Sequence, residues 1–229
     1  MKKETLKLSL TLMFYTLIAG IALALVYQIT EQRIAEAELA NVIKSMEFLL
    51  TDENNNQIVD SDTIKKLVIE KRQESGKELY SDGVGTVISP VYEFESNNVK
   101  YYVLTGNAVG YGGKVLTMAA FKYENGELSL YKIKVLDYSQ ETPGLGAKIA
   151  DGNIQARFYP IPEEGLKNGL KVDKDAGKQT IDPETAKTEG VAKVSDVMTG
   201  ATITPRAVAN SINAMYKFLK EKYTQGGGN

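Results

Sequence analysis

The longest apolar pattern lies near the start of the chain, where residues 8–27 carry no charged side chain. At a rise of about 1.5 Å per residue, a helix of this length crosses a hydrocarbon core roughly 30 Å thick. The pattern therefore predicts a transmembrane helix over residues 8–28. A cleaved signal peptide is the alternative, although the apolar core of such a peptide usually has only about 7–15 residues.

The charges around this span predict its orientation. Lys2, Lys3 and Lys7 precede the span, whereas Arg33 after it is flanked by Glu31 and Glu36. Cytoplasmic flanks carry an excess of lysine and arginine. We therefore expect residues 1–7 to lie in the cytoplasm and the chain beyond the span to lie outside it.

Residues 29–50 continue with apolar positions at helical spacing, which predicts an amphipathic stalk helix. These positions are Ile34, Leu39, Val42, Ile43, Met46, Leu49 and Leu50. Such a stripe usually packs on its own domain, and an interface with a partner helix is the alternative. The polar cluster at residues 52–56 is expected to end the helix by turn chemistry.

Between residues 84 and 138 the pattern changes to β-branched and aromatic runs. We expect strands over residues 86–94, 100–104, 114–123 and 128–136, separated by turns at 95–98, 106–113 and 123–127. Short polar turns between such runs favour an antiparallel meander over βαβ units. The sequence thus predicts an α+β domain over residues 51–224, with an antiparallel sheet and packed helices, followed by a flexible tail at 225–229.

The last helix of the chain begins beside a threonine. Thr199-Gly200-Ala201-Thr202 precedes an amphipathic helix, with Thr204 predicted as its N-cap and Pro205 as its first residue. The start of a helix gathers unpaired N–H groups and a positive dipole, so a phosphate ester on Thr202 would lie in a favourable field. The alternative is a simple turn before a helix.

Two glycine-containing loops are further candidates for a site. In Glu141-Thr142-Pro143-Gly144-Leu145-Gly146, Pro143 and Gly144 suit a type II turn that presents Thr142 and Leu145, although turn chemistry alone also explains the loop. The cluster at 106–113 lacks the dinucleotide and Walker patterns, and we interpret it as a hairpin connection. Tyr111 within it is interpreted as packing, with a surface for a flat cofactor as the alternative.

Composition narrows the chemistry. The net charge of −2 and the mixed signs show no nucleic-acid footprint. The chain has no cysteine and no histidine, which excludes thiolate metal sites, cysteine nucleophiles and imidazole bases. No catalytic residue and no metal site are predicted, so any chemistry is expected to come from a bound cofactor.

The anchor, the 141–146 loop and the Thr-Gly-Ala-Thr motif occur in an order that resembles the covalent-flavin subunits of the RnfG/NqrC family, on its RnfG side. The resemblance implies FMN joined to Thr202 by a phosphoester. It implies that Thr199, Gly200 and Ala201 shape the attachment turn. It also places flavin contacts in the other loop, at Glu141, Thr142, Gly144, Leu145 and Gly146, with Lys148 a weaker candidate.

The same resemblance implies a biological role. It predicts an electron carrier, not a catalyst on its own, in an Rnf-type ion-translocating ferredoxin:NAD⁺ oxidoreductase with other integral-membrane and iron–sulfur subunits. A Mg²⁺-dependent flavin transferase would attach FMN, and the FMN domain would lie on the outer side of the cytoplasmic (inner) membrane. The alternatives are an NqrC-type subunit of a Na⁺-translocating NADH:quinone oxidoreductase, a solitary flavin carrier, or a non-redox binding module.

Overall fold

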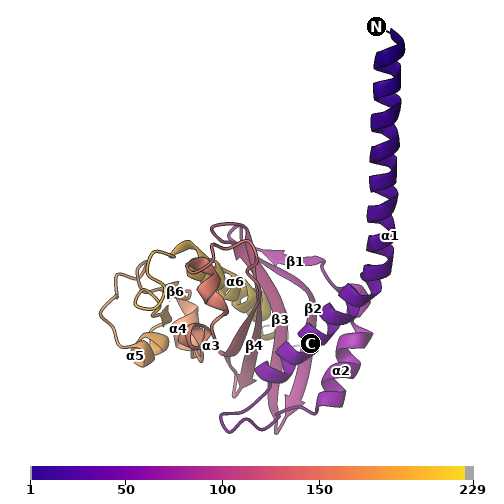
Figure 1. Ribbon diagram of the computed structural model, residues 1–229. Helices are drawn as coiled ribbons and strands as arrows, with labels where there is room; N and C mark the ends of the chain where they lie inside the picture. Colours follow the sequence, from indigo (N-terminus) through magenta and orange to yellow (C-terminus); the bar gives the residue numbers. More distant parts are fainter. Residues whose placement is uncertain (1, 225–229) are drawn as a thin grey trace. The chain divides into compact units, whose positions relative to one another are not determined.

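The computed structural model describes residues 2–224 and contains two compact units, residues 1–42 and residues 43–229 (Figure 1). The flexible tail predicted for residues 225–229 lies outside the described residues. The division of the first fifty residues into a span at 8–28 and a stalk at 29–50 stays a prediction.

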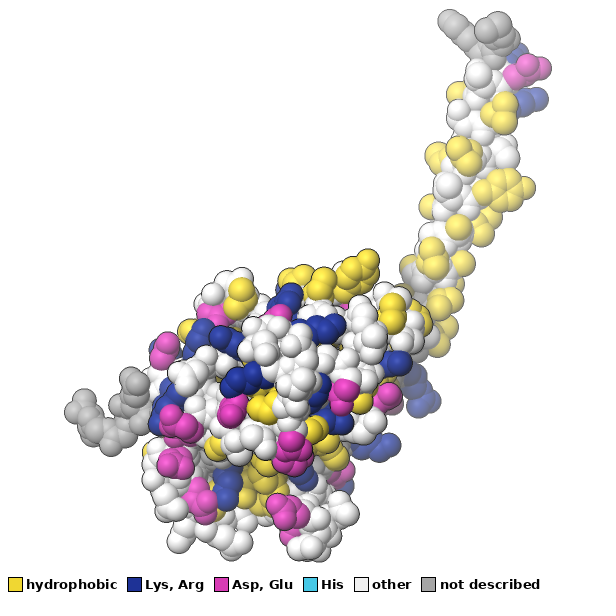
Figure 2. Space-filling view, turned by 90° about the vertical axis from the view of Figure 1, so that its left-hand side faces the viewer, with side chains coloured by type: hydrophobic (Ala, Val, Ile, Leu, Met, Phe, Trp, Pro, Cys, Tyr) yellow, Lys and Arg dark blue, Asp and Glu magenta, His cyan; other side chains and the backbone are white. Residues whose placement is uncertain are grey.

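The first unit is made by helix α1, which runs without a break from Lys2 to Leu49. Over residues 3–29 its side chains are exposed, and Figure 2 shows hydrophobic groups along much of the visible helix. Within the described residues, it is the one helix long and apolar enough to cross a membrane, and none of its most apolar stretch is buried. Its length and composition are those of a membrane anchor.

The end of α1 belongs to the second unit and packs there. Met46, Leu49 and Leu50 are fully buried, whereas Ile34 is 51% exposed. The packed interpretation of the stalk therefore holds for these last turns. The helix ends where expected, because a carboxylate oxygen of Asp52 accepts the backbone N–H of Asn56 at 2.8 Å and closes a turn.

A five-stranded antiparallel sheet forms the centre of the second unit, in the order in which its strands occur along the chain. This arrangement confirms the α+β class and the predicted meander. Its first strand was not predicted, and the others are longer than predicted. The strands are β1 (Glu78–Ser81), β2 (Gly85–Ser96), β3 (Val99–Val109), β4 (Lys114–Glu124) and β5 (Glu127–Asp137).

Helix α6 (Ile203–Leu219) covers one face of the sheet (Figure 1). Its apolar stripe is fully buried in one core with Leu104 and Phe121 of the sheet. The stripe is the predicted one, Val208, Ile212, Met215 and Leu219.

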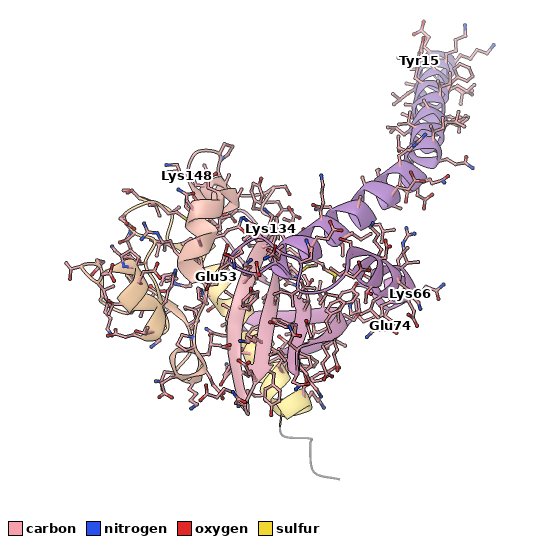
Figure 3. All side chains as sticks on the ribbon, turned by 90° about the horizontal axis from the view of Figure 1, so that it is seen from below. Tyr15, Glu53, Lys66, Glu74, Lys134 and Lys148 are labelled. Atoms are coloured by element: carbon pink, nitrogen blue, oxygen red, sulfur yellow. The ribbon has the colours of Figure 1, made fainter. Side chains whose placement is uncertain are left out.

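The opposite face of the sheet holds the segment that follows α1. Side chains alternate between faces along a strand, so Tyr101 points away from α6. Its ring lies 5.7 Å from the ring of Tyr131, whose hydroxyl donates to the carbonyl of Thr51 at 2.7 Å. Lys132 donates to the same carbonyl, and Lys134 lies over the ring of Phe48 (Figure 3). Helix α2 (Ser61–Glu70) follows, with Ile64 and Val68 buried.

The loop predicted over residues 106–113 is shorter than expected. Strand β3 continues to Val109, and only residues 110–113 form the turn, closed by the N–H of Gly110 and the carbonyl of Gly113 at 2.6 Å. Gly106 pairs with Thr117 within the sheet. A Cβ there would lie 3.2 Å from a side-chain carbon of Met215, so this glycine lets α6 approach the sheet closely.

Short elements link β5 to α6 and close the remaining edge of the core. They are η2 (Gly146–Ala150), α3 (Gly152–Gln155), η3 (Ala156–Phe158), α4 (Glu163–Lys167), β6 (Lys171–Val172), α5 (Pro183–Thr188) and β7 (Val191–Ala192), with η4 (Lys220–Thr224) after α6. Strands β6 and β7 pair in parallel. Next to them, the buried carboxylate of Asp173 accepts hydrogen bonds from Lys193 and from the backbone N–H of Val194 and Ser195, which fixes the chain after β6.

Candidate functional site

A cleft of about 470 Å³ opens where three segments meet: the β3–β4 turn, the 141–146 loop and the start of α6. Its wall combines apolar side chains, two hydroxyls beside the helix start and one carboxylate. The lining residues are Tyr111, Glu141, Thr142, Leu145, Gly146, Gly200, Ala201, Thr202, Ile203 and Thr204. The volume lies within the range of roughly 300–1,000 Å³ that is usual for small-molecule and cofactor sites.

Glu141 joins these segments. It is only 4% exposed, and one of its oxygens accepts the backbone N–H of Gly112 at 3.1 Å. The other oxygen accepts the hydroxyl of Thr204, at the start of α6. With both oxygens engaged, the carboxylate holds the walls of the cleft together, and buried carboxylates need such partners.

Glycines let these segments come close enough for the carboxylate to reach them. A Cβ on Gly110 would lie 2.3 Å from a carboxylate oxygen of Glu141. One on Gly146 would lie 2.4 Å from the other oxygen and 2.6 Å from the hydroxyl oxygen of Thr204. Only glycine fits at either position without displacing Glu141.

The turn predicted at residues 142–145 is present. The N–H of Leu145 donates to the carbonyl of Thr142 at 3.1 Å, and Gly144 has a φ of +75°, as the third position of a type II turn requires. Thr142 and Leu145 line the cleft, as predicted, and Leu145 is 45% exposed. An apolar side chain is thus held open to solvent by a defined bend.

Thr202 takes the N-cap position of α6, immediately before Ile203. Gly200 has a φ of +84°, which turns the chain into the helix, and the N–H of Ala201 donates to the carbonyl of Met198 at 3.2 Å. The prediction that Thr204 caps the helix and Pro205 begins it is wrong. The hydroxyl of Thr204 is directed to Glu141 instead, inside the first turn.

Three predicted residues do not line the cleft: Thr199, Gly144 and Lys148. Thr199 and Gly144 are exposed next to residues that line the cleft. Lys148 is exposed on η2, at the outer edge of the unit (Figure 3). Tyr111, interpreted as packing, is 72% exposed and lines the cleft, so that interpretation is wrong.

Sequence reasoning missed Lys174, in the loop after β6. Its ammonium nitrogen donates to the hydroxyl oxygen of Thr202 at 3.3 Å. The two residues are 28 positions apart, and no local motif links them. Only the pairing of β6 with β7 and the packing of this loop beside α6 bring them together.

Comparisons with known proteins agree with this geometry. The RnfG N-terminal region family matches residues 1–47, and the FMN-binding domain family matches residues 110–217, which include every residue of the cleft. A crystal structure of an RnfG protein of an electron transport complex from Thermotoga maritima is 38% identical, with a TM-score of 0.66. The match covers 80% of this chain and 97% of the Thermotoga maritima chain.

Two curated relatives are named as the G component of an ion-translocating oxidoreductase complex. The protein from Methanosarcina acetivorans is 28% identical over 178 residues, which are 76% of this chain and 85% of the relative. The protein from Shewanella amazonensis is 28% identical over 225 residues, which are 96% of this chain and 90% of the relative. Both likenesses extend well beyond a single motif.

FMN fits the residues of the cleft. Tyr111, Leu145 and Ile203 offer an exposed aromatic ring and two partly exposed aliphatic side chains to a flat ring system, and Thr202 lines the same cleft. Fold and cleft together define an FMN-binding electron-transport domain that follows an apolar N-terminal helix. The chain belongs to the RnfG family.

Proposed function

We propose that the chain holds FMN covalently on Thr202 and carries electrons as the RnfG-type component of an ion-translocating, membrane-bound oxidoreductase complex. The observation that supports this most directly is the position of Thr202, which lines the cleft at the N-cap of the 17-residue helix α6. An anion there meets free N–H groups and the positive end of the helix dipole.

Attachment is a phosphoryl transfer in which the chain supplies the nucleophile. The hydroxyl oxygen of Thr202 attacks the phosphorus of the FMN half of FAD, and the bond from that phosphorus to the oxygen bridging the two phosphates breaks. AMP leaves, and the hydroxyl proton passes to a base of the transferase. The proposal therefore includes a Mg²⁺-dependent flavin transferase as maturation partner.

Once bound, FMN supplies one- and two-electron redox chemistry, and the chain sets its surroundings. Tyr111 and Leu145 would offer apolar surface to the flavin ring. Glu141 is a positioning residue, because its oxygens are occupied by Gly112 and Thr204. The ester keeps FMN on the chain, whereas a cofactor that dissociated outside the membrane would be diluted away.

The proposed partners are the other subunits of the complex, which include integral-membrane and iron–sulfur subunits. We place the second unit on the outer side of the cytoplasmic membrane because the lysines precede the span. The chain has no cysteine. Single variants Lys3→Cys and Glu184→Cys would therefore report sidedness: in intact cells, a membrane-impermeant thiol reagent should label only Glu184→Cys.

The attachment is tested by coexpressing the chain with a flavin transferase and recording flavin fluorescence in a denaturing gel, together with peptide masses. Thr202→Val removes the nucleophile, and Thr180→Val is the matched control, because Thr180 is exposed and lies outside both the cleft and the attachment motif. We expect a fluorescent band and an FMN adduct on the Thr202 peptide in wild type and in Thr180→Val, and neither in Thr202→Val. An unmodified wild type beside a modified reference flavoprotein would refute the proposal.

A further inference from the structure

We infer that Lys174 is the phosphate-binding residue of this site and pairs with the phosphodiester formed on Thr202. This inference rests on the proposed function, since it concerns the phosphate of FMN attached there. The ammonium nitrogen of Lys174 lies 3.3 Å from the oxygen that would carry the phosphorus. The two non-bridging oxygens of the ester, which share its negative charge, would lie two bonds from that hydroxyl oxygen, within reach of a flexible lysine side chain.

Three cations near Lys174 have carboxylate partners. Lys178 pairs with Glu189, Lys193 with Asp173, and Arg206 with Asp175. Across residues 2–224, Lys174 makes no ion pair and contacts Thr202 instead. The nearby carboxylates of Asp173 and Asp175 each have their own cationic partner, and Lys174 is the cation that contacts the hydroxyl of Thr202.

The loop that carries Lys174 is fixed on both sides of it. Before it, the fully buried carboxylate of Asp173 accepts backbone N–H groups of residues 194 and 195. After it, Asp175 accepts two hydrogen bonds from Arg206, both at 2.6 Å. A two-pronged arginine–carboxylate pair fixes orientation as well as distance.

Arg206 lies one helical turn beyond Thr202, and the backbone N–H of Arg206 donates to the carbonyl of Thr202 at 3.3 Å. Helix α6, which begins beside Thr202, therefore also binds Asp175, the residue next to Lys174. Helix α6 thus fixes the position of Thr202 directly and that of Lys174 through the pair of Arg206 with Asp175, so the fold sets the distance between Thr202 and Lys174. The lysine is prepositioned for an anion on that hydroxyl oxygen.

The test compares four chains loaded with FMN by coexpression: wild type, Lys174→Gln, Lys174→Arg and Lys178→Gln. Peptide masses first establish the adduct on Thr202. The ³¹P resonance of each folded protein is then compared with that of the proteolytically released, solvated flavin peptide. We expect the resonance of Lys174→Gln to move from the wild-type position toward the peptide, while Lys174→Arg and Lys178→Gln stay near wild type.

The initial rate of flavin loading by purified transferase and FAD gives a second measurement. Loss of a charge-assisted hydrogen bond predicts a rate about three- to tenfold lower in Lys174→Gln, with Lys178→Gln unchanged. Equal ³¹P positions in loaded wild type and loaded Lys174→Gln would overturn the inference. A wild type without adduct would instead overturn the proposed function, and this inference with it. A folded Lys174→Gln chain that resists loading while Lys174→Arg loads would support the inference.

Discussion

The hydroxyl of Thr204 donates a hydrogen bond to the carboxylate of Glu141, a residue 63 positions earlier in the chain. Both side chains are buried, and the second carboxylate oxygen binds the N–H of Gly112. A single acidic side chain thus connects the β3–β4 turn, the 141–146 loop and the first turn of α6. The shape of the cleft depends on this connection.

Substituting either partner should destabilise the second unit. We expect Glu141→Gln and Thr204→Val each to lower the free energy of unfolding by about 1–3 kcal/mol, since each leaves a buried polar group without its charged or hydroxyl partner. Urea unfolding measures this, with the exposed Glu184→Gln as control. Because the two residues share one hydrogen bond, the double variant should lose less free energy of unfolding than the sum of the losses in the two single variants. Strict additivity would contradict the described contact.

Two glycine substitutions separate crowding at the cleft from a general effect of alanine. In Gly146→Ala the new Cβ would meet Glu141 and Thr204 at 2.4 and 2.6 Å, and we expect a loss of about 1–3 kcal/mol from overpacking. Gly152 has open space around its Cβ position and no positive φ, so Gly152→Ala should change stability by less than about 1 kcal/mol. Thermal unfolding followed by circular dichroism would show the difference. Equal midpoints would argue against the close approach of Gly146.

Tyr111 should matter for the flavin and not for the fold. Its side chain is 72% exposed, so Tyr111→Ala is expected to alter the free energy of unfolding by no more than about 0.5 kcal/mol. Removing the aromatic wall should nevertheless shift the absorption bands of the covalently held flavin and increase its fluorescence yield. Tyr111→Phe is the matched control and should retain the wild-type spectrum. An unchanged spectrum in Tyr111→Ala would place the flavin away from this ring.

Asp173 makes stability depend on pH in the acid range. Burial by itself raises the pKa of this carboxyl, but hydrogen bonds from Ser195, Val194 and Lys193 outweigh it and hold the pKa below the ordinary value of 3.8. A lowered pKa in the folded state means that the stabilisation is present above about pH 3.8 and is lost as pH falls through the folded value.

Asp173→Asn should therefore lower the free energy of unfolding by about 2–3 kcal/mol at pH 7, since it leaves the ammonium of Lys193 without its buried partner. The difference from wild type should shrink as the pH is lowered below 3.8. Urea titrations at pH 7, 5 and 3 would measure this. A difference that stays constant over this range would show that ionisation of Asp173 is not its source.

Local patterns predicted the elements of the fold where local chemistry decides them. The alternating strands, the stripe from Val208 to Leu219 and the turn at Pro143-Gly144 are all present. Strand β1 was missed because three of its four residues are exposed, so it carries no alternating apolar pattern.

The remaining errors have long-range causes. Gly106 looks like a turn residue, yet the nearness of α6 explains it. Thr204 looks like a helix cap, but its hydroxyl donates to Glu141 instead. Lys174 contacts Thr202 across 28 positions, in a loop that follows the strand paired with β7. Contacts between segments distant in sequence leave no periodicity or motif that a single chain reveals.

The apolar helix at the start of the chain has a further consequence for how this carrier meets its partners. A chain held in a bilayer meets the other subunits of its complex on a surface instead of in a volume, so assembly depends on lateral diffusion and on the density of the subunits in the membrane. Confinement to the membrane raises the effective concentration of the partners, so a weaker intrinsic affinity is enough for them to associate. The contacts that join this chain to the other subunits of its complex then need less affinity than contacts between two dissolved proteins would need.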